Sequence, residues 1–177
     1  PDFGKATIRE VVAISTELEQ RTHKEFIHME MGVPGLKPSQ VGVDAEINAL
    51  KQGIAAIYPN INGLSDLKKE ASRFIKAFID IDVSPSGCVP VSGSMQGTFA
   101  SFLVCGQCVP GRDTILFIDP GFPVQKQQIK VMGYNYASFD VYDFRGDKLR
   151  TKLEEYLSQG NIAALVYSNP NNPAWFC

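Results

Sequence analysis

The feature that most constrains the fold is an alternation of short apolar runs and helix-length segments in the second half of the chain. The apolar runs are short enough for strands and end in turn residues. They predict strands at residues 89–91, 114–118, 136–139 and 163–167. The segments between them predict a helix that ends near Val104, a helix at residues 124–132 and a helix that Asp147 can cap. Strands that alternate with helices form crossover units, so we predict an α/β fold with a mainly parallel, helix-flanked sheet.

The residues before this region predict helices without strands between them. A capping box of Thr7 and Glu10 begins a helix that continues to about residue 20. Residues 26–31 alternate apolar and polar side chains and predict a short extended piece, and residues 44–56 predict a second helix.

A third helix opens at residues 63–64, with Ser65 or Asp66 as its cap, and ends near residue 80. The break at residues 58–63 is the predicted domain boundary, between the N-terminal arm and the strand-helix region. We therefore predict an N-terminal helical arm at residues 1–57 and a larger domain at residues 58–177.

Composition argues against several classes of protein. A net charge of -2 does not suit a nucleic-acid binder, which needs a concentrated basic face. The apolar runs are far shorter than the ~20 residues that span a bilayer, and the first residues do not resemble a signal segment. Cys105 and Cys108 form a C-x-x-C pattern without a second pair or a nearby histidine, so we expect buried, unreactive thiols and no metal site. The composition suits a reducing cytoplasm, and we expect no membrane partner.

Three predicted loops contain groups that suit a ligand. At Gly93 a strand passes into a helix, and the amides at a helix start attract an anion. Phe122 lies in a tight Pro-Gly-Phe-Pro loop, from which an aromatic ring can stack on a flat ligand. Residues 169–173 form a stiff loop with side-chain amides at a strand's carboxyl end, where open α/β sheets bind ligands.

Taken alone, the loops at Gly93 and at residues 169–173 are equally consistent with ordinary turns, and the alternative for Phe122 is an aromatic ring that folds back into the core. The segment at Gly93 is not a P-loop or a dinucleotide fingerprint, and Met95 stands where a hydrolase elbow has serine. Taken together, the three loops predict a site for a flat ring that bears a phosphate.

In order and spacing, these segments resemble the fold-type I aminotransferases of class I/II, which depend on pyridoxal 5'-phosphate (PLP). The resemblance runs from about Ile8 to Trp175 and corresponds to the N-terminal half of that family. It implies that residues 58–177 are a truncated large PLP-binding domain. It also implies that Asn172 hydrogen-bonds the cofactor's ring oxygen and that Phe122 stacks on its pyridine ring. The implied phosphate cradle consists of Ser94, Met95 and Gln96.

The resemblance also assigns residues in the N-terminal arm. Gly32, in the Met-Gly-Val-Pro segment, is expected to lie by the substrate carboxylate. Tyr58, which Gly63 and Lys68 follow at family spacing, is expected to reach the cofactor phosphate of the partner subunit in a homodimer. The bonds before Pro120 and Pro173 are expected to be cis.

The implied activity is amino-group transfer between an amino acid and a 2-oxo acid. The family's Schiff-base lysine, its acidic partner for the pyridine nitrogen and its substrate-binding arginine all follow the position of Asn172. The sequence has no lysine, aspartate or arginine after Asn172, so we expect an N-terminal fragment that is inactive alone. Lys126, Lys130 and Lys152 fall on predicted helix surfaces and are interpreted as solvated charges.

One departure from the family leaves the reaction open. Ala174 and Trp175 follow Pro173, where the family usually has Thr-Gly. Because the reaction-selecting groups are not in this sequence, a lyase, decarboxylase or acyl transferase of the same fold is an alternative. A non-catalytic regulator that binds PLP or an amino acid is another.

Overall fold

The structure is a computed structural model, and it describes residues 6–174. The predicted match at Trp175 lies outside these residues. The described chain falls into two units, one that ends at Tyr58 and one that begins at Pro59. Among the described residues, no helix is long and apolar enough to cross a membrane.

The unit that ends at Tyr58 consists of helices and an extended connection. Helix α1 spans Ile8–Thr22, and both hydrogen bonds of the predicted capping box between Thr7 and Glu10 are present, which confirms that prediction. Helix α2 spans Gln40–Lys51, so it begins and ends earlier than predicted. The left-handed backbone of Gly53, with φ 82°, separates it from the short 3-10 helix η1 at Ile54–Ala56.

The unit that begins at Pro59 contains helix α3 at Ser65–Ile79 and the 3-10 helix η2 at Pro85–Gly87 before the strand-helix region. The N-cap of α3 is Leu64, so the predicted caps Ser65 and Asp66 lie inside the first turn. Asp147 likewise begins its helix, and Gly146 is the N-cap. Both cap predictions were wrong because each chosen residue already has helical backbone.

The strand-helix region follows the predicted order. Its helices are α4 at Ser94–Cys108, α5 at Pro123–Met132 and α6 at Asp147–Leu157. Its strands are β1 at Thr114–Asp119, β2 at Asn135–Asp140 and β3 at Ile162–Val166. They form a parallel sheet in the order β2-β1-β3, with Leu116 opposite Ala137 on one side and Leu165 on the other. The predicted α/β class is therefore confirmed.

The predicted strand at residues 89–91 is absent from the described sheet, and these residues are irregular. A strand exists only where a neighbour accepts and donates its backbone hydrogen bonds, and none of the three strands pairs with this segment. The prediction was wrong because apolar character alone does not supply a partner.

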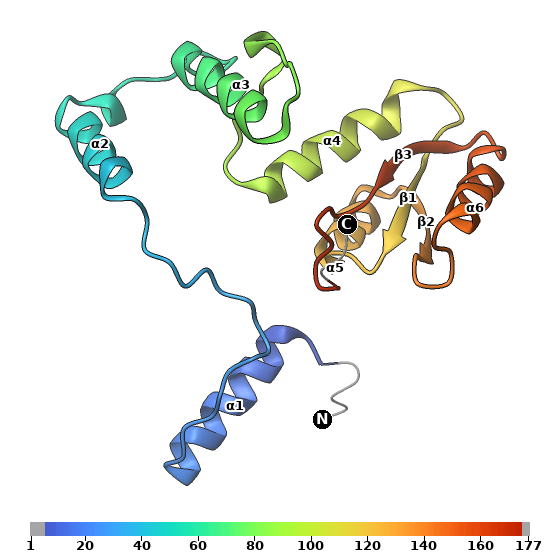
Figure 1. The fold of residues 1–177 in the computed structure, drawn as a ribbon, viewed down its shortest axis with the longest axis horizontal. Coiled ribbons are helices and arrows are strands. Elements are labelled where there is room, and N and C mark those ends of the chain that lie inside the picture. Colours follow the sequence, from blue (N-terminus) through green and yellow to red (C-terminus); the bar gives the residue numbers. More distant parts are fainter. Residues whose placement is uncertain (1–5, 175–177) are drawn as a thin grey trace. The chain divides into compact units, whose positions relative to one another are not determined.

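The core lies on both faces of β1, the central strand. Ile115 and Phe117 pack with Phe102 of α4 and Ile129 of α5. Leu116 points to the opposite face, where the partly buried side chains of α6 pack. The two sets alternate because successive side chains of a strand point to opposite faces. Helices α4 and α5 therefore lie on one side of the sheet and α6 on the other (Figure 1).

Candidate functional site

The start of α4 presents backbone N-H groups to solvent. Gly93, its N-cap, has a φ of 88°, and a Cβ built there meets no atom within 4 Å. The N-H groups of Ser94 and Met95 have no partner within the helix because they precede the first helical hydrogen bond. Both residues are exposed. This arrangement suits an anion, since the N-H groups and the helix dipole both favour negative charge.

Gln96 has a different role from its two neighbours. Its side-chain Oε1 accepts a hydrogen bond from the N-H of Ser92 at 2.6 Å, and its own N-H donates to the carbonyl of Gly93 at 3.2 Å. The side chain therefore holds the preceding loop against the first turn of α4. Of the three predicted cradle residues, Ser94 and Met95 present N-H groups and Gln96 shapes the loop.

The second predicted group, Phe122, lies at the start of α5. It is the N-cap of that helix, Pro123 is the first helical residue, and the Phe122 side chain is 45% exposed. The peptide bonds before Pro120 and Pro173 are both cis, as predicted, and the bond before Pro170 is cis as well. The ring is thus available to a ligand at the carboxyl end of β1.

The third predicted group lies in the loop after β3, where two adjacent asparagines differ. Asn172 is exposed, and its N-H donates to Ser168 Oγ at 3.3 Å. Asn171 is 5% exposed, and its Nδ2 donates to the carbonyl of Pro120 at 2.8 Å. Sequence reasoning missed this role of Asn171, because the residue it bonds lies 51 positions earlier in the chain.

Hydrogen bonds link the start of α4 to helix α5, and the loop before α5 to the loop after β3. Gln128 of α5 donates from Nε2 to the carbonyl of Met95 at 2.8 Å, and Thr98 of α4 donates to Gln128 Oε1 at 2.9 Å. The bond from Asn171 to Pro120 then links the loop after β3 to the loop before α5. The structure therefore brings together the segments that carry Ser94, Met95, Phe122 and Asn172.

A cavity of about 310 Å³ adjoins the loop after β3, on the side of α6. Ile118 of β1, Leu149 of α6 and Asn169 contribute to its lining, together with the buried Asn171. Its lining residues do not include Ser94, Phe122 or Asn172. This cavity is therefore a separate hollow at the same end of the sheet.

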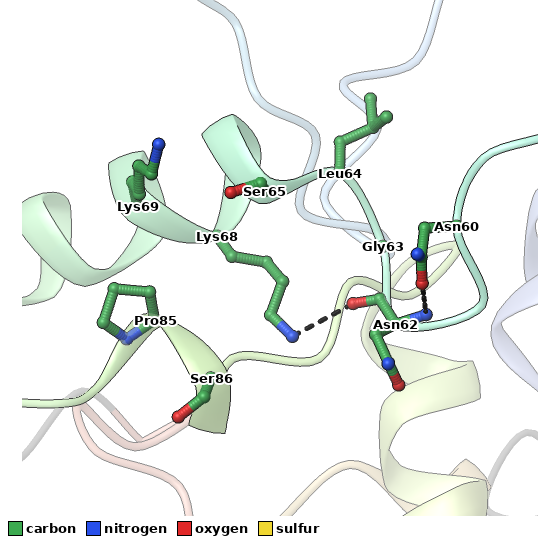
Figure 2. Close-up of a pocket in the computed structure, with 9 residues that line it drawn as sticks. All are labelled: Asn60, Asn62, Gly63, Leu64, Ser65, Lys68, Lys69, Pro85 and Ser86. Atoms are coloured by element: carbon green, nitrogen blue, oxygen red, sulfur yellow. Dashed lines mark hydrogen bonds between the residues drawn. The ribbon is translucent and has the colours of Figure 1, made fainter.

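Gly32 and Tyr58 belong to the unit that ends at Tyr58, and both are exposed. Gly63, which follows Tyr58 in the predicted motif, has a φ of 86°, and a Cβ there would lie 2.6 Å from Cγ of Pro90. Only glycine fits this position. Lys68 donates to the carbonyl of Asn62 at 3.0 Å across a cavity of about 480 Å³ (Figure 2).

The segment before Gly32 contains a histidine between two carboxylates. Nδ1 of His28 lies 2.7 Å from Glu30 Oε1, and Nε2 lies 3.1 Å from Glu19 Oε1. Hydrogen bonds to Glu30 and Glu19 raise the pKa of His28. The bond from the N-H of Phe26 is the main cause that lowers the pKa of Glu19, and the bond from His28 is the main cause for Glu30. The contacts of His28 with Glu19 and Glu30 thus tie α1 to the residues that precede the predicted substrate loop.

Two of the three lysines interpreted as solvated charges are partly buried, so that interpretation was wrong for them. The Lys126 side chain is 25% exposed and lies 2.5 Å from Asp119 Oδ2. The Lys152 side chain is 18% exposed, and its ion pair with Glu155 is the main cause that raises its pKa. Lys130 is exposed, as predicted. Periodicity places a residue on a helix face but does not say what its flexible stem covers.

The cysteines are free among the described residues, and Cys105 is half-buried whereas Cys108 is exposed. The prediction of buried thiols was therefore wrong for Cys108, which lies at the last position of α4. Within residues 6–174, no group of three or more histidine, cysteine or acidic side chains is placed to hold a metal ion.

Comparison with known proteins decides the family. The sequence profile described as "Aminotransferase class I and II" matches residues 24–174. This chain belongs to the class I and II aminotransferases. The resemblance drawn from the loops is thereby confirmed at the level of the family.

Individual relatives in this family are distant and longer. The (5-formylfuran-3-yl)methyl phosphate transaminase of Methanocaldococcus jannaschii is 26% identical over 174 residues, which are 97% of this chain and 43% of that protein. The LL-diaminopimelate aminotransferase of Natranaerobius thermophilus is 27% identical over 88% of this chain and 40% of its own length. The chain therefore spans less than half the length of these relatives.

Solved structures share the fold. A single mutant of the aspartate aminotransferase of Thermus thermophilus superposes with a TM-score of 0.77 at 18% identity, over 96% of this chain and 43% of that one. The alanine aminotransferase of Pyrococcus furiosus gives a TM-score of 0.74 at 24% identity, over 94% and 42%. At such identities the likeness supports the fold and says nothing about the substrate.

Proposed function

We propose that the whole protein is a PLP-dependent aminotransferase and that this chain contributes the phosphate-binding and ring-stacking side of its cofactor site. The observation that supports this most is the junction of three loops: the start of α4, the loop before α5 and the loop after β3. Each loop offers a different kind of contact, and a phosphorylated aromatic ring uses all three kinds.

The donor set fits PLP. The N-H groups of Ser94 and Met95 suit the phosphate, and the hydroxyl of Ser94 adds a further donor. Phe122 offers a partly exposed ring for stacking, and the exposed amide of Asn172 can donate to a ring oxygen. PLP, when bound, supplies the electron sink for moving an amino group between an amino acid and a 2-oxo acid.

The residues of this chain bind and orient the cofactor in this proposal, and they do not carry out proton transfer. Gln96 keeps the loop before α4 in place while the backbone of Ser94 and Met95 holds the anion. We propose that the covalent attachment and the proton transfers belong to residues outside this sequence, so that residues 1–177 alone are inactive. The same division leaves a lyase, decarboxylase, acyl transferase or regulator of this fold as outcomes for experiment to separate.

We further propose that the whole protein is a homodimer, with Gly32 by the substrate carboxylate and Tyr58 directed to the partner's cofactor phosphate. The unit that ends at Tyr58 supports a partner because its large apolar side chains are exposed: Ile27 is 89%, Leu36 is 94% and Tyr58 is 99% exposed. The relatives named above act on different compounds, so we propose only amino acid and 2-oxo acid substrates. The cytoplasmic location stays a prediction from composition.

The test is a PLP titration of the whole protein, followed by addition of amino acids to detect the amino form of the cofactor. We compare wild type with Phe122→Ala and with Phe78→Ala, a control whose ring lies on α3 and is 76% exposed. Loss of the stacking ring should weaken PLP binding about three- to tenfold, and the control should not.

A wild-type protein that does not bind PLP would refute the proposal. Binding without amino-group transfer to any amino acid would favour the alternative enzymes or the regulator.

A further inference from the structure

We propose that Asn171 and Lys126 are positioning residues that hold the loop at residues 119–122, and with it the ring of Phe122, for the cofactor. The inference rests on the proposed function, because it takes Phe122 to be the residue that stacks on PLP. Neither residue is a predicted ligand, and neither needs to touch the cofactor. We call the pair the loop clamp.

Asn171 fixes the second residue of the loop. Its side chain is 5% exposed and uses both polar atoms: Nδ2 donates to the carbonyl of Pro120 at 2.8 Å, and Oδ1 accepts from the N-H of Ala174 at 3.0 Å. A buried amide is costly unless both ends are hydrogen-bonded, so its position is closely defined. One side chain therefore joins the loop that carries Phe122 to the loop that carries Asn172.

Lys126 fixes Asp119, the last residue of β1, at which the held segment starts. It lies on α5 four positions after Phe122, and its Nζ lies 2.5 Å from Asp119 Oδ2 and 3.3 Å from Ser138 Oγ of β2. The ammonium also lies 5.7 Å from the centre of the Phe117 ring. Both side chains of the ion pair are less than a third exposed, so solvent and salt screen it less than a surface pair.

The loop is thus held at Asp119 by α5, at Pro120 by the loop after β3, and at Phe122 by its place as the N-cap of α5. This leaves little freedom to the backbone that carries the ring. A stacking ring contributes only if it is already oriented, because ordering it on binding would cost entropy. The geometry therefore points to a role in cofactor binding as well as in folding.

The test uses the whole protein with two clamp variants. Asn171→Asp keeps the acceptor for Ala174, removes the donor to Pro120 and places a negative charge beside its carbonyl. Lys126→Met keeps an apolar stem and removes the ion pair. Lys126→Arg, which keeps the charge, tests rescue.

Each variant has a matched control. Asn161→Asp changes an asparagine at the other end of β3, whose Nδ2 donates to Thr114 Oγ1 at 3.2 Å. Lys130→Met removes an exposed lysine from the same helix α5. Both controls change a residue of the unit that begins at Pro59, and neither removes a contact to the loop at residues 119–122.

Three quantities are measured: the Kd for PLP, the visible circular dichroism of the bound cofactor, and hydrogen exchange of the Gly121 and Phe122 amides without cofactor. We expect Asn171→Asp and Lys126→Met to weaken PLP binding by about three- to tenfold, and by no more than Phe122→Ala does, to change the circular dichroism and to speed exchange. Lys126→Arg should recover most of the affinity. The controls should match wild type in all three.

Clamp variants with the affinity and circular dichroism of wild type would overturn the inference while leaving the proposed function intact. Equal losses in clamp and control variants would overturn it too, because the effect would then be general to the sheet. A wild type that does not bind PLP refutes the proposed function and the cofactor role of the clamp together. In that case, clamp variants in which the Gly121 amide exchanges as fast as in wild type would also show that the clamp does not hold the loop at residues 119–122.

Discussion

In the unit that begins at Pro59, Ile115, Leu116 and Ile129 are fully buried between the sheet and its helices, whereas no side chain between residues 6 and 58 is buried. The second unit has its own core, and hydrogen bonds and an ion pair hold the loops at the end of its sheet. The first has polar contacts between exposed or half-buried groups, such as the capping box at Thr7 and the carboxylates around His28. Similar helices in the two units should therefore respond differently to the same substitution.

Truncation of a core residue should give the largest effect. Leu116→Ala removes a fully buried side chain from the central strand and should lower the free energy of unfolding of the sheet unit by about 2–5 kcal/mol. Ile27→Ala, at a side chain that is 89% exposed, should change the free energy of unfolding of the unit that ends at Tyr58 by less than about 0.5 kcal/mol. Chemical denaturation of the whole protein measures both. Equal losses would mean that the first unit is also packed in solution.

Glycine-to-alanine changes in two helices should have opposite signs. A Cβ at Gly106 of α4 would lie 2.6 Å from the ring of Tyr134, whose hydroxyl bonds Gln107, so Gly106→Ala should destabilise by about 1–3 kcal/mol. At Gly42 of α2 the Cβ meets nothing within 4 Å, and alanine should stabilise that helix by about 0.5–1 kcal/mol. Hydrogen exchange in each helix measures the change in its stability. Two changes of the same sign would contradict the expected difference between the two helices.

A cap substitution should have a smaller, local effect. Thr7→Ala removes the side-chain acceptor for the N-H of Glu10 and should destabilise α1 by about 1 kcal/mol. Ser39 is the N-cap of α2, but its side chain makes no cap hydrogen bond within the described residues, so Ser39→Ala is the matched control and should be nearly neutral. Amide exchange in the first turns of α1 and α2 is the measurement. A loss at Ser39 as large as at Thr7 would contradict this account of the caps.

The smallest expected effect is a pH dependence in the first unit. Bonds to Glu30 and Glu19 raise the pKa of His28 above its ordinary value of 6.5. Their contribution should be complete below that value and should be lost as the pH rises through the raised pKa. NMR titration of the His28 ring in wild type and Glu30→Gln measures it, and the variant should have the lower pKa. An unchanged pKa would show that the contact to Glu30 does not persist in solution.

The local sequence pattern predicted which segments can form strands, but it did not predict which strands pair. Residues 114–118 predicted β1 almost to its ends, because a strand buried on both faces is an unbroken apolar run. Residues 89–91 have similar local character but no strand beside them among the described residues. Because strand pairing joins segments that are distant in the sequence, a local pattern does not predict it.

The residues of the candidate site also fall into two groups: those that the local pattern singled out and those that it missed. Gly93, Phe122 and Asn172 stand out because turns and helix starts have their own residue chemistry. The burial of Asn171 depends on a carbonyl 51 residues away, and the contacts of Lys126 depend on two strands and a helix. Such supporting residues emerge only when the loops are seen together.

In the proposed function, this chain forms the side of a PLP site that holds the phosphate and stacks on the ring. An experimental structure of the whole protein with PLP bound tests it most directly. We expect the phosphate to accept hydrogen bonds from the N-H groups of Ser94 and Met95 and the pyridine ring to stack on Phe122. A phosphate bound away from the start of α4, or a ring out of contact with Phe122, would contradict the proposal.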